Sequence, residues 1–467
     1  MYKKIIFLFI IILLNGLTNT TKLNLLVSLP QFAMILYFIV FNKIDKAIFW
    51  HFLFFITSFT YYGDASTAEA GVTLTSYNYA KLKLIGPVGF SHIIATLLFV
   101  RVLRRPLIKK NDVFYQFYKF LIYLMITGFG LGFIGFTFSD YYNEGLVQYG
   151  SYVIVIFIHT TILYRMNNTV LRERFYEIIV PLLVLFPIST FILSIINPEI
   201  IGEPAASFYS MLLLPALLNK KKIAFILIGL IFLIHNSIVL GSSGKSLVML
   251  LFFALITLVL SFNKNVKLRL PIRSRIIRVI SISFIFSIPT IILILNQKYG
   301  GSSSIVSKMY QVRTLGEFIL YGGNLQNISS SPYIRVTSLL NILYEGLENP
   351  IILLFGRGYG GYFNDHFNYF SGLDLYRGAF SDRAILSGNY YTGHDTMVTI
   401  PMFNGLIGFY LLIKIIIKYF KLSRINFIAL SVIPFLLLAF YFDTLIGVTG
   451  VLLLFVSTHN TLDLKRM

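Results

Sequence analysis

Long apolar stretches, separated by short polar or basic segments, run through almost the whole chain. Uncharged apolar stretches of about 18 or more residues are long enough to cross a bilayer as helices, and shorter ones are expected to be tilted, broken or re-entrant. The pattern predicts an all-α polytopic membrane protein with fourteen spans, at residues 5–17, 23–41, 46–60, 84–103, 117–138, 148–164, 178–196, 207–218, 223–240, 247–262, 277–295, 397–417, 426–442 and 444–457.

The first apolar run, Ile5 to Leu17, follows Lys3 and Lys4. A basic start and a short apolar core are also typical of a signal peptide, but no small-x-small cleavage site follows. We therefore expect a retained first helix.

One long segment without a predicted span divides the chain into three parts. Residues 1–295 form a transmembrane bundle of eleven spans, 296–396 a large outer loop, and 397–467 the last spans with a short tail. Within the loop, apolar residues recur at steps of three and four from Val336 to Leu347, and Asn349-Pro350 follows. This periodicity predicts a helix that rests on the membrane and ends before Pro350, in a loop that is folded rather than disordered.

Composition supports the membrane assignment, because 57% of the 467 residues are hydrophobic and only 12% are charged. A soluble protein of this size has no interior large enough for so much apolar surface. The chain has no cysteine, which excludes disulfides, thiolate chemistry and cysteine metal sites.

The formal net charge is +20, and the positive charges gather in particular loops. Lysine and arginine accumulate in cytoplasmic loops of membrane proteins, so the charge indicates topology and does not indicate a nucleic-acid partner. Fourteen spans put every strongly basic loop on one side, with both termini, and leave mildly acidic loops on the other. The basic loops are 101–110, 165–174, 220–222, 263–278 and 414–424. The outer loop carries seven basic and seven acidic residues, so its arginines do not belong to this excess.

Candidate chemistry concentrates between Arg335 and Gly408. Arg335 opens the predicted loop helix, and a guanidinium suits a phosphate because its fork donates two parallel hydrogen bonds. Gly356, Gly358, Gly360 and Gly361 form a run that can turn sharply or approach a ligand closely. His394-Asp395 stands just before the next span, where a histidine could transfer a proton. Arg335 or His394, taken alone, is more often an interfacial side chain without a catalytic role.

A second cation, Lys245, lies in Gly241–Ser246, which reads GSSGKS between two apolar spans. The first glycine is two residues too close for a nucleotide-binding loop, so either Lys245 grips a phosphate as a point charge or the segment is only a tight turn. Histidines also lie within spans or at their ends, at 51, 92, 159 and 235, as does Asp443; such groups are functional candidates by default. No ligand spacing in the chain argues for a metal.

The outer loop is rich in tyrosine, phenylalanine and asparagine, including Tyr359, Tyr362, Phe363 and Tyr390. Aromatic faces and amides suit sugar rings, but aromatics are equally typical of a membrane interface. Composition alone does not choose between these two interpretations.

In their order, these motifs resemble the O-antigen polymerase and O-antigen ligase superfamily of bacterial envelope enzymes. Arg335, Asn349-Pro350 and Phe355-Gly356-Arg357-Gly358-Tyr359-Gly360 are similar to its "R … nP…fGvGxg" segment. Gly393-His394-Asp395 with Gly405-Leu406-Ile407-Gly408 is similar to its "HN … GliG" segment, and the GSSGKS passage occupies the place of its "SRG" turn. Two departures stand out: Asp395 replaces the usual asparagine, and Ser243 stands where an arginine is expected, so Lys245 would supply that charge.

The resemblance implies a GT-C-like fold in the bacterial cytoplasmic membrane. It also implies glycan transfer at the outer face, from a donor linked to undecaprenyl pyrophosphate and without metal or cofactor. His394 and Arg335 would be catalytic, with His394 either orienting or deprotonating the acceptor hydroxyl or binding pyrophosphate as a cation. Lys245, Arg357, Gly358, Tyr359, Gly360 and Asp395 would bind pyrophosphate or sugar.

The expected partners are the lipid-linked oligosaccharide, membrane lipid and, as a candidate, a chain-length regulator. We favour a polymerase of repeat units over the ligase that transfers glycan to lipid A-core, because the first arginine of the ligase-like turn is missing and the chain is long. A flippase for the same lipid-linked sugars is the alternative of another class, and the absence of a clear internal repeat disfavours it.

Overall fold

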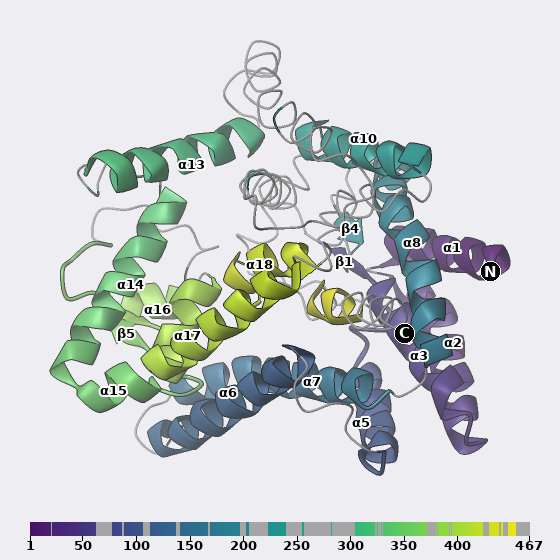
Figure 1. Ribbon diagram of the computed structural model, residues 1–467, viewed down its shortest axis with the longest axis horizontal. Coiled ribbons are helices and arrows are strands. Elements are labelled where there is room, and N and C mark those ends of the chain that lie inside the picture. Colours follow the sequence, from purple (N-terminus) through teal and green to yellow (C-terminus); the bar gives the residue numbers. More distant parts are fainter. Residues whose placement is uncertain are drawn as a thin grey trace.

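The computed structural model is mostly helical (Figure 1). It describes residues 1–19, 21–61, 77–85, 88–105, 113–136, 141–166, 169–196, 202–204, 223–239, 255, 282, 304–322, 325, 328, 330–370, 380, 382–391, 393, 395–423, 429–438, 440–441 and 447–453.

The first half of the chain contributes helices that pack against their neighbours in the sequence and also against helices that are distant in the sequence. They are α1 (Tyr2–Thr18), α2 (Leu25–Val40), α3 (Ile44–Ile56), α5 (Phe90–Leu103), α6 (Val113–Phe136), α7 (Tyr141–Tyr164), α8 (Thr169–Ile196) and α10 (Ile223–Val239), with a 3-10 turn at Lys22–Asn24. The second half contributes α13 (Ser304–Tyr321), α14 (Ser330–Glu348), α15 (Pro350–Phe355), α16 (Asp382–Ser387), α17 (Thr396–Ser423) and α18 (Ala429–Leu438).

Four helical segments of the described residues are long and apolar enough to cross a membrane. They are Lys22–Val40, Phe114–Gly135, Val170–Ile196 and Thr396–Leu422, and shorter apolar helices cover Phe90–Leu103, Tyr149–Tyr164 and Ala224–Asn236. The structure therefore agrees with a helical membrane protein. The predicted spans 207–218, 247–262 and 277–295 lie outside the described residues apart from Leu255 and Ile282, so the number fourteen stays a prediction.

Several predicted boundaries were wrong, and local hydrogen bonding explains two of them. The span expected from residue 84 begins as a helix only at Phe90, because β2 (Lys83–Ile85) and β3 (Val88–Gly89) pair just before it. The span expected over 46–60 ends at Ile56, and β1 (Phe59–Tyr61) then pairs antiparallel with β4 (Gly202–Pro204). Together with the pair β5 (Phe363–Asn364) and β6 (Asn389–Tyr390), these short sheets depart from a purely α-helical prediction.

One end of the bundle gathers basic residues from loops that are distant in the sequence, and we call it the basic end. Arg105 pairs with Asp45 at 2.9 Å, and Arg165 donates to the carbonyl oxygens of Leu103 and Arg105. Lys119, close to the start of α6, lies near enough to Lys418 of α17 for their charges to repel. The structure thus groups the basic loops at 101–105 and 165–174 as the charge pattern does.

The loops predicted on the other side meet at the opposite end of the N-terminal helices. Asn78 donates to the carbonyl oxygen of Phe59 and to the side-chain oxygen of Asn19, and Thr60 is paired with Glu203 in the β1–β4 ladder. Loops between α1 and α2, after α3, before α5 and after α8 therefore share one end.

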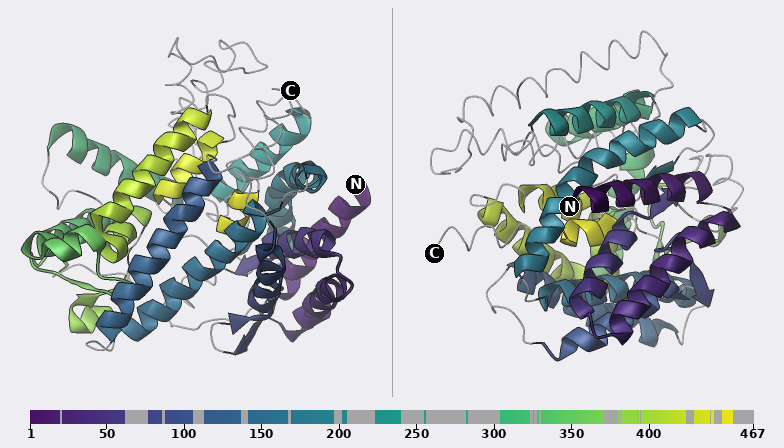
Figure 2. Two further views of the ribbon diagram at one scale, coloured as in Figure 1. Left: turned by 60° about the horizontal axis from the view of Figure 1, so that its bottom comes forward. Right: turned by 90° about the vertical axis from the view of Figure 1, so that its right-hand side faces the viewer.

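Helices α6, α7 and α17 run side by side and carry the outer-loop residues at the end away from the basic end (Figure 2, left). Tyr149 of α7 packs on Phe403 of α17 with ring centroids 4.6 Å apart, whereas Arg165 at the other end of α7 belongs to the basic end. Sixteen residues of helix separate these two points by about 24 Å. The predicted loop site and the basic loops therefore lie at opposite ends of α7.

Candidate functional site

An ion pair joins two predicted site residues that are sixty positions apart. The Nε of Arg335 on α14 lies 3.0 Å from Oδ2 of Asp395, which directly precedes α17. The other carboxylate oxygen of Asp395 accepts the backbone N–H of Val398 at 3.1 Å, so Asp395 also caps the helix. The Asp395 side chain is 9% exposed and that of Arg335 33% exposed.

Burial raises the pKa of the Asp395 carboxyl, while Arg335 and the backbone N–H groups of α17 act in the opposite direction. The carboxylate is thus held between a guanidinium and the positive end of a helix. Arg335 keeps a third of its side chain exposed, and five N–H donors allow a guanidinium to bind more than one acceptor.

Sequence reasoning missed the centre of the described loop, which is Glu345 of α14. Its Oε2 pairs with Nη2 of Arg357 at 2.5 Å, and its Oε1 receives the backbone N–H of Asn364 at 2.9 Å and the Nε2 of His366 at 2.7 Å. The Glu345 side chain is 7% exposed. Arg357, a predicted phosphate ligand, is thereby committed to a buried carboxylate.

The buried face of α14 carries several polar residues beside apolar ones such as Ile334 and Ile342. Ser338, Asn341 and Glu345 are buried at steps of three and four, and Asn341 bonds Asp365 and the backbone of His366. In the apolar stripe that predicted the helix, Leu340 and Leu347 are exposed at 36% and 72%, and the other members are half-buried. An outward apolar face agrees with a helix lying on a membrane. The spacing of the polar residues was the available signal for the buried face.

Asn349-Pro350 ends α14 as predicted and also begins α15. The Asn349 side chain accepts the backbone N–H of Ile351, and Pro350 takes the first helical position, where its missing N–H costs nothing. A helix break followed at once by a new N-terminus turns the chain toward the glycine run.

The glycine run turns sharply, as one of the two predicted uses requires, and its close contacts are with helices. Gly356, Gly358 and Gly360 all have positive φ, of 82°, 74° and 92°. A Cβ at Gly358 would lie 2.2 Å from the backbone nitrogen of Gly132, and the run bonds the kinked start of α17 through Arg357 N–H to Met402 O at 2.9 Å. The close partners are thus helices α6 and α17.

Tyr359 fills the space that Gly128 and Gly132 leave open on α6. Its ring is fully buried, its backbone N–H donates to Gly128 O at 2.8 Å, and its hydroxyl donates to Leu124 O at 3.0 Å. Burial raises the pKa of this hydroxyl. Because neither the ring nor Gly358 and Gly360 presents a surface to a ligand, we leave these three residues out of the proposed site.

The loop aromatics divide into a packed cluster and an exposed group. Phe363, Phe370, Phe380 and Tyr390 are buried against one another, with Phe380 and Tyr390 centroids 4.7 Å apart. Tyr344 and Phe367 remain exposed at 38% and 45%, with centroids 5.0 Å apart. Most of the aromatic richness therefore builds the loop core, and a smaller part is open to a ligand.

Two histidines of the predicted spans form one buried hydrogen-bonded chain. His51 and His159 approach at 3.3 Å between their Nε2 atoms, and their other nitrogens meet the hydroxyls of Tyr79 at 2.8 Å and Thr449 at 2.9 Å. All four side chains are fully buried. The chain connects α3, α7 and the 447–453 helix in the bundle interior.

His394 and Lys245 lie outside the described residues. Within the described part of the chain, no group of three or more histidine or acidic side chains is placed to hold a metal ion. No protein-family model, no curated protein and no solved structure matches this chain. Its resemblance to the O-antigen superfamily and a GT-C-like fold therefore stay predictions.

Proposed function

We propose that this protein is a polymerase that joins polyprenyl-diphosphate-linked oligosaccharide repeats at the outer face of a bacterial cytoplasmic membrane. The observation that carries the proposal is the Arg335–Asp395 pair. It combines a guanidinium, a buried carboxylate and the N-terminus of α17 at the membrane end opposite the basic loops, and His394 is the neighbour of Asp395 in the chain.

The reaction breaks the bond between the anomeric carbon of the donor sugar and the diphosphate oxygen. The acceptor hydroxyl oxygen forms the new glycosidic bond, the electron pair of the broken bond stays on the lipid diphosphate, and the hydroxyl proton passes to a base. A diphosphate leaving group needs fixed positive charge, since stabilising developing charge is commonly the largest catalytic term. In the proposal Arg335 and Lys245 supply this charge and no metal or cofactor is needed.

His394 has two roles open to it: it takes the hydroxyl proton, or it binds the diphosphate as a cation. Asp395 positions Arg335 and caps α17 rather than reacting. Arg357 is assigned to the support of the loop, because Glu345 holds it.

The outer loop supplies surfaces suited to both halves of the substrate. The outward apolar face of α14 and α15, including Leu347 and Ile351, suits contact with the outer leaflet that holds the lipid carrier. The exposed Tyr344 and Phe367 rings suit the C–H faces of a sugar acceptor.

The test is complementation of a strain that lacks the gene, with glycan lengths resolved on a gel. Arg335→Ala should reduce chain growth by about two orders of magnitude or more, as loss of one charge-stabilising donor does in other enzymes. Arg313→Ala is the matched control: it removes an arginine from the same loop whose partner, Glu317, is a surface residue one helical turn away. It should leave the glycan unchanged.

A second variant separates catalysis from folding, because Arg335→Ala alone leaves a buried carboxylate unpaired. Arg335→Ala combined with Asp395→Asn removes that charge and keeps a capping side chain, so the double variant should insert normally and remain inactive. Asp395→Asn alone should retain activity. Normal glycan length in the double variant would reject the assignment of Arg335.

The same strain distinguishes the other activities. Loss of a polymerase leaves single repeats attached to the final acceptor, whereas loss of a ligase leaves long chains on the lipid carrier. Chain growth by the purified protein in sealed vesicles, with donor supplied on the outer side, would exclude a flippase.

A further inference from the structure

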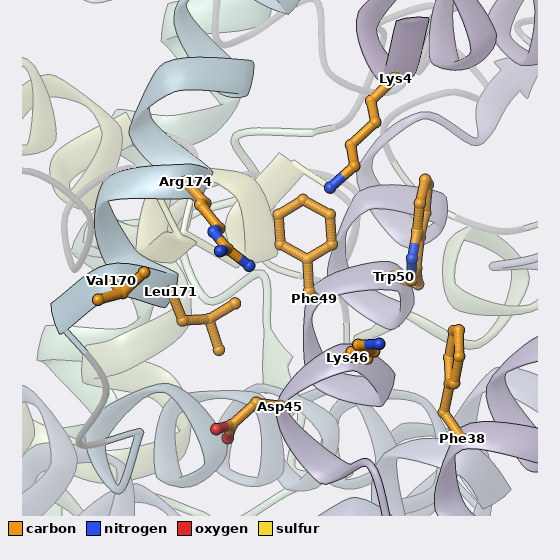
Figure 3. Close-up of a pocket in the computed structure, with 9 residues that line it drawn as sticks. All are labelled: Lys4, Phe38, Asp45, Lys46, Phe49, Trp50, Val170, Leu171 and Arg174. Carbon is orange, nitrogen blue, oxygen red and sulfur yellow. The ribbon is translucent and has the colours of Figure 1, made fainter. Parts of the chain in front are cut away.

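A cavity at the basic end lies between α1, α2, α3 and α8, far along the chain from the outer-loop residues. Its volume is about 270 Å³, and Figure 3 shows the side chains that line it. The ammonium group of Lys4 and the guanidinium of Arg174 both point toward the ring of Phe49, and Lys46 and Trp50 come from the same helix as Phe49. A water occupies about 30 Å³ in the liquid, so the cavity has room for a group of several heavy atoms.

The charges around this cavity do not balance. Asp45 is the carboxylate in the lining, and it is already paired with Arg105 at 2.9 Å. Among the described residues, neither Lys4, Lys46 nor Arg174 lies within ion-pair distance of a carboxylate, and this includes Glu173 and Glu177 on α8 beside Arg174. The ammonium group of Lys4 lies over the face of Phe49, with Nζ 5.0 Å from the ring centroid.

Cations gathered from three separate helices repel one another unless an anion joins them. All three side chains are exposed and line the same hollow, so an anion that binds there can reach each of them. A phosphate group matches this requirement, because a guanidinium and ammonium groups can each donate to its oxygens.

The side chains around the cavity favour a lipid headgroup as the source of such a phosphate. Two of the helices that line the cavity, α1 and α2, also expose apolar side chains, including Phe7 at 45%, Ile10 at 48% and Leu36 at 41%. Trp50 is half-buried and packs against Phe7 and Phe54, as aromatic residues at a membrane interface do. Apolar surface on the same helices as a basic hollow suits acyl chains near a headgroup.

We propose that this cavity binds the phosphate of an anionic phospholipid in the leaflet at the basic end, with Lys4, Lys46 and Arg174 as its ligands. The acyl chains lie against the exposed apolar surface of α1 and α2. This site does not depend on the proposed polymerase activity, since it uses none of the outer-loop residues.

Trp50 makes the proposal directly measurable, because it is the only tryptophan of the chain. The full-length protein in a neutral detergent is titrated with phosphatidylglycerol that carries bromine on its acyl chains, and quenching of Trp50 fluorescence is followed. We expect saturable quenching, and much weaker quenching by brominated phosphatidylcholine. Lys4→Gln/Lys46→Gln/Arg174→Gln should weaken the apparent affinity for phosphatidylglycerol on the order of a hundredfold, since basic residues near an anionic lipid act additively.

The matched control is Lys414→Gln/Lys418→Gln/Lys421→Gln, which removes the same charge from the basic end at α17 and should retain the affinity. Val170→Phe fills the cavity without changing a charge or adding a tryptophan, and it should weaken quenching as the triple variant does. Circular dichroism of each variant verifies folding.

Three results would overturn the proposal. Equal losses in the two triple variants would mean diffuse attraction to anionic lipid. Retained affinity in the cavity triple variant or in Val170→Phe would mean that the cavity is not the site. Displacement of the brominated lipid by inorganic phosphate at the same concentration would assign the site to a soluble anion.

Discussion

The Glu345–Arg357 pair is expected to hold the outer loop onto α14, and breaking it should open that loop locally. Arg357→Met keeps a side chain of similar length and removes the charge. Glu345 is 7% exposed and Arg357 18% exposed, so the substitution leaves a buried carboxylate without its strongest partner. Losing one member of a buried pair costs about 3 kcal/mol or more.

Local opening of the loop can be measured at the backbone segment that is hydrogen-bonded to Glu345. Its Oε1 receives the N–H of Asn364 and the Nε2 of His366, so residues 363–370 should open more often once the carboxylate is destabilised. If the free energy of local opening decreases by about 3 kcal/mol, amide exchange becomes roughly a hundredfold faster. Hydrogen–deuterium exchange with mass spectrometry measures this for the peptide covering 363–370.

Two further variants test the reasoning. Arg357→Met with Glu345→Gln removes the unpaired charge and should recover much of the protection, because the two residues are coupled. Arg313→Met, in an exposed pair one turn from Glu317, should leave exchange over 363–370 unchanged. Unaltered exchange in Arg357→Met, or a double variant whose protection loss equals the sum of the single losses, would show that this pair does not hold the loop.

Three other predictions concern the fold. Burial raises the pKa of Asp395 above 3.8, so the folded protein binds this proton more readily than the unfolded chain does. The stability that protonation contributes should therefore fall as pH rises through the folded pKa. The melting temperature of the wild type should decrease more steeply between pH 4 and 7 than that of Asp395→Asn, which cannot bind this proton. Gly358→Ala should impair insertion or folding strongly, because φ is +74° and a Cβ would lie 2.2 Å from Gly132 N, whereas Gly130→Ala on the open side of α6 should fold normally in detergent-stability assays. His159→Leu should destabilise the bundle by about 1–3 kcal/mol, because it leaves hydrogen-bonding partners unpaired. Adding His51→Leu should lower the free energy of unfolding by less than it would if the two histidines were independent, as measured by equilibrium unfolding in SDS.

Local features of the chain were predictable because they depend on neighbours in sequence. Apolar runs predicted helices, the Asn349-Pro350 step predicted the end of α14, and the glycine run predicted a sharp turn. Even so, the end of α3 and the start of α5 were predicted wrongly, because residues there form short strands. One strand pairs with a distant segment and the other with an adjacent one.

The partners of charged residues were not predictable in the same way. Arg335 and Arg357 were both predicted to act on the substrate, yet one meets Asp395 at 33% exposure and the other is held by Glu345 inside the loop. Only the packing of α14 on α17 and on the 356–370 segment distinguishes them. Tyr359 likewise looked like a sugar ligand until its ring was found against Gly128.

Taken by itself, the sequence determined that this chain forms apolar helices, which loops carry positive charge, and where the chain turns, because periodicity, charge and backbone freedom are properties of short segments. The tertiary structure alone decided that α14 buries a carboxylate and an amide, that Glu345 organises the outer loop, and that Lys4, Lys46 and Arg174 surround one cavity. Those results depend on which helix surfaces meet, and residues forty to more than a hundred positions apart acquire a shared environment only when the helices pack.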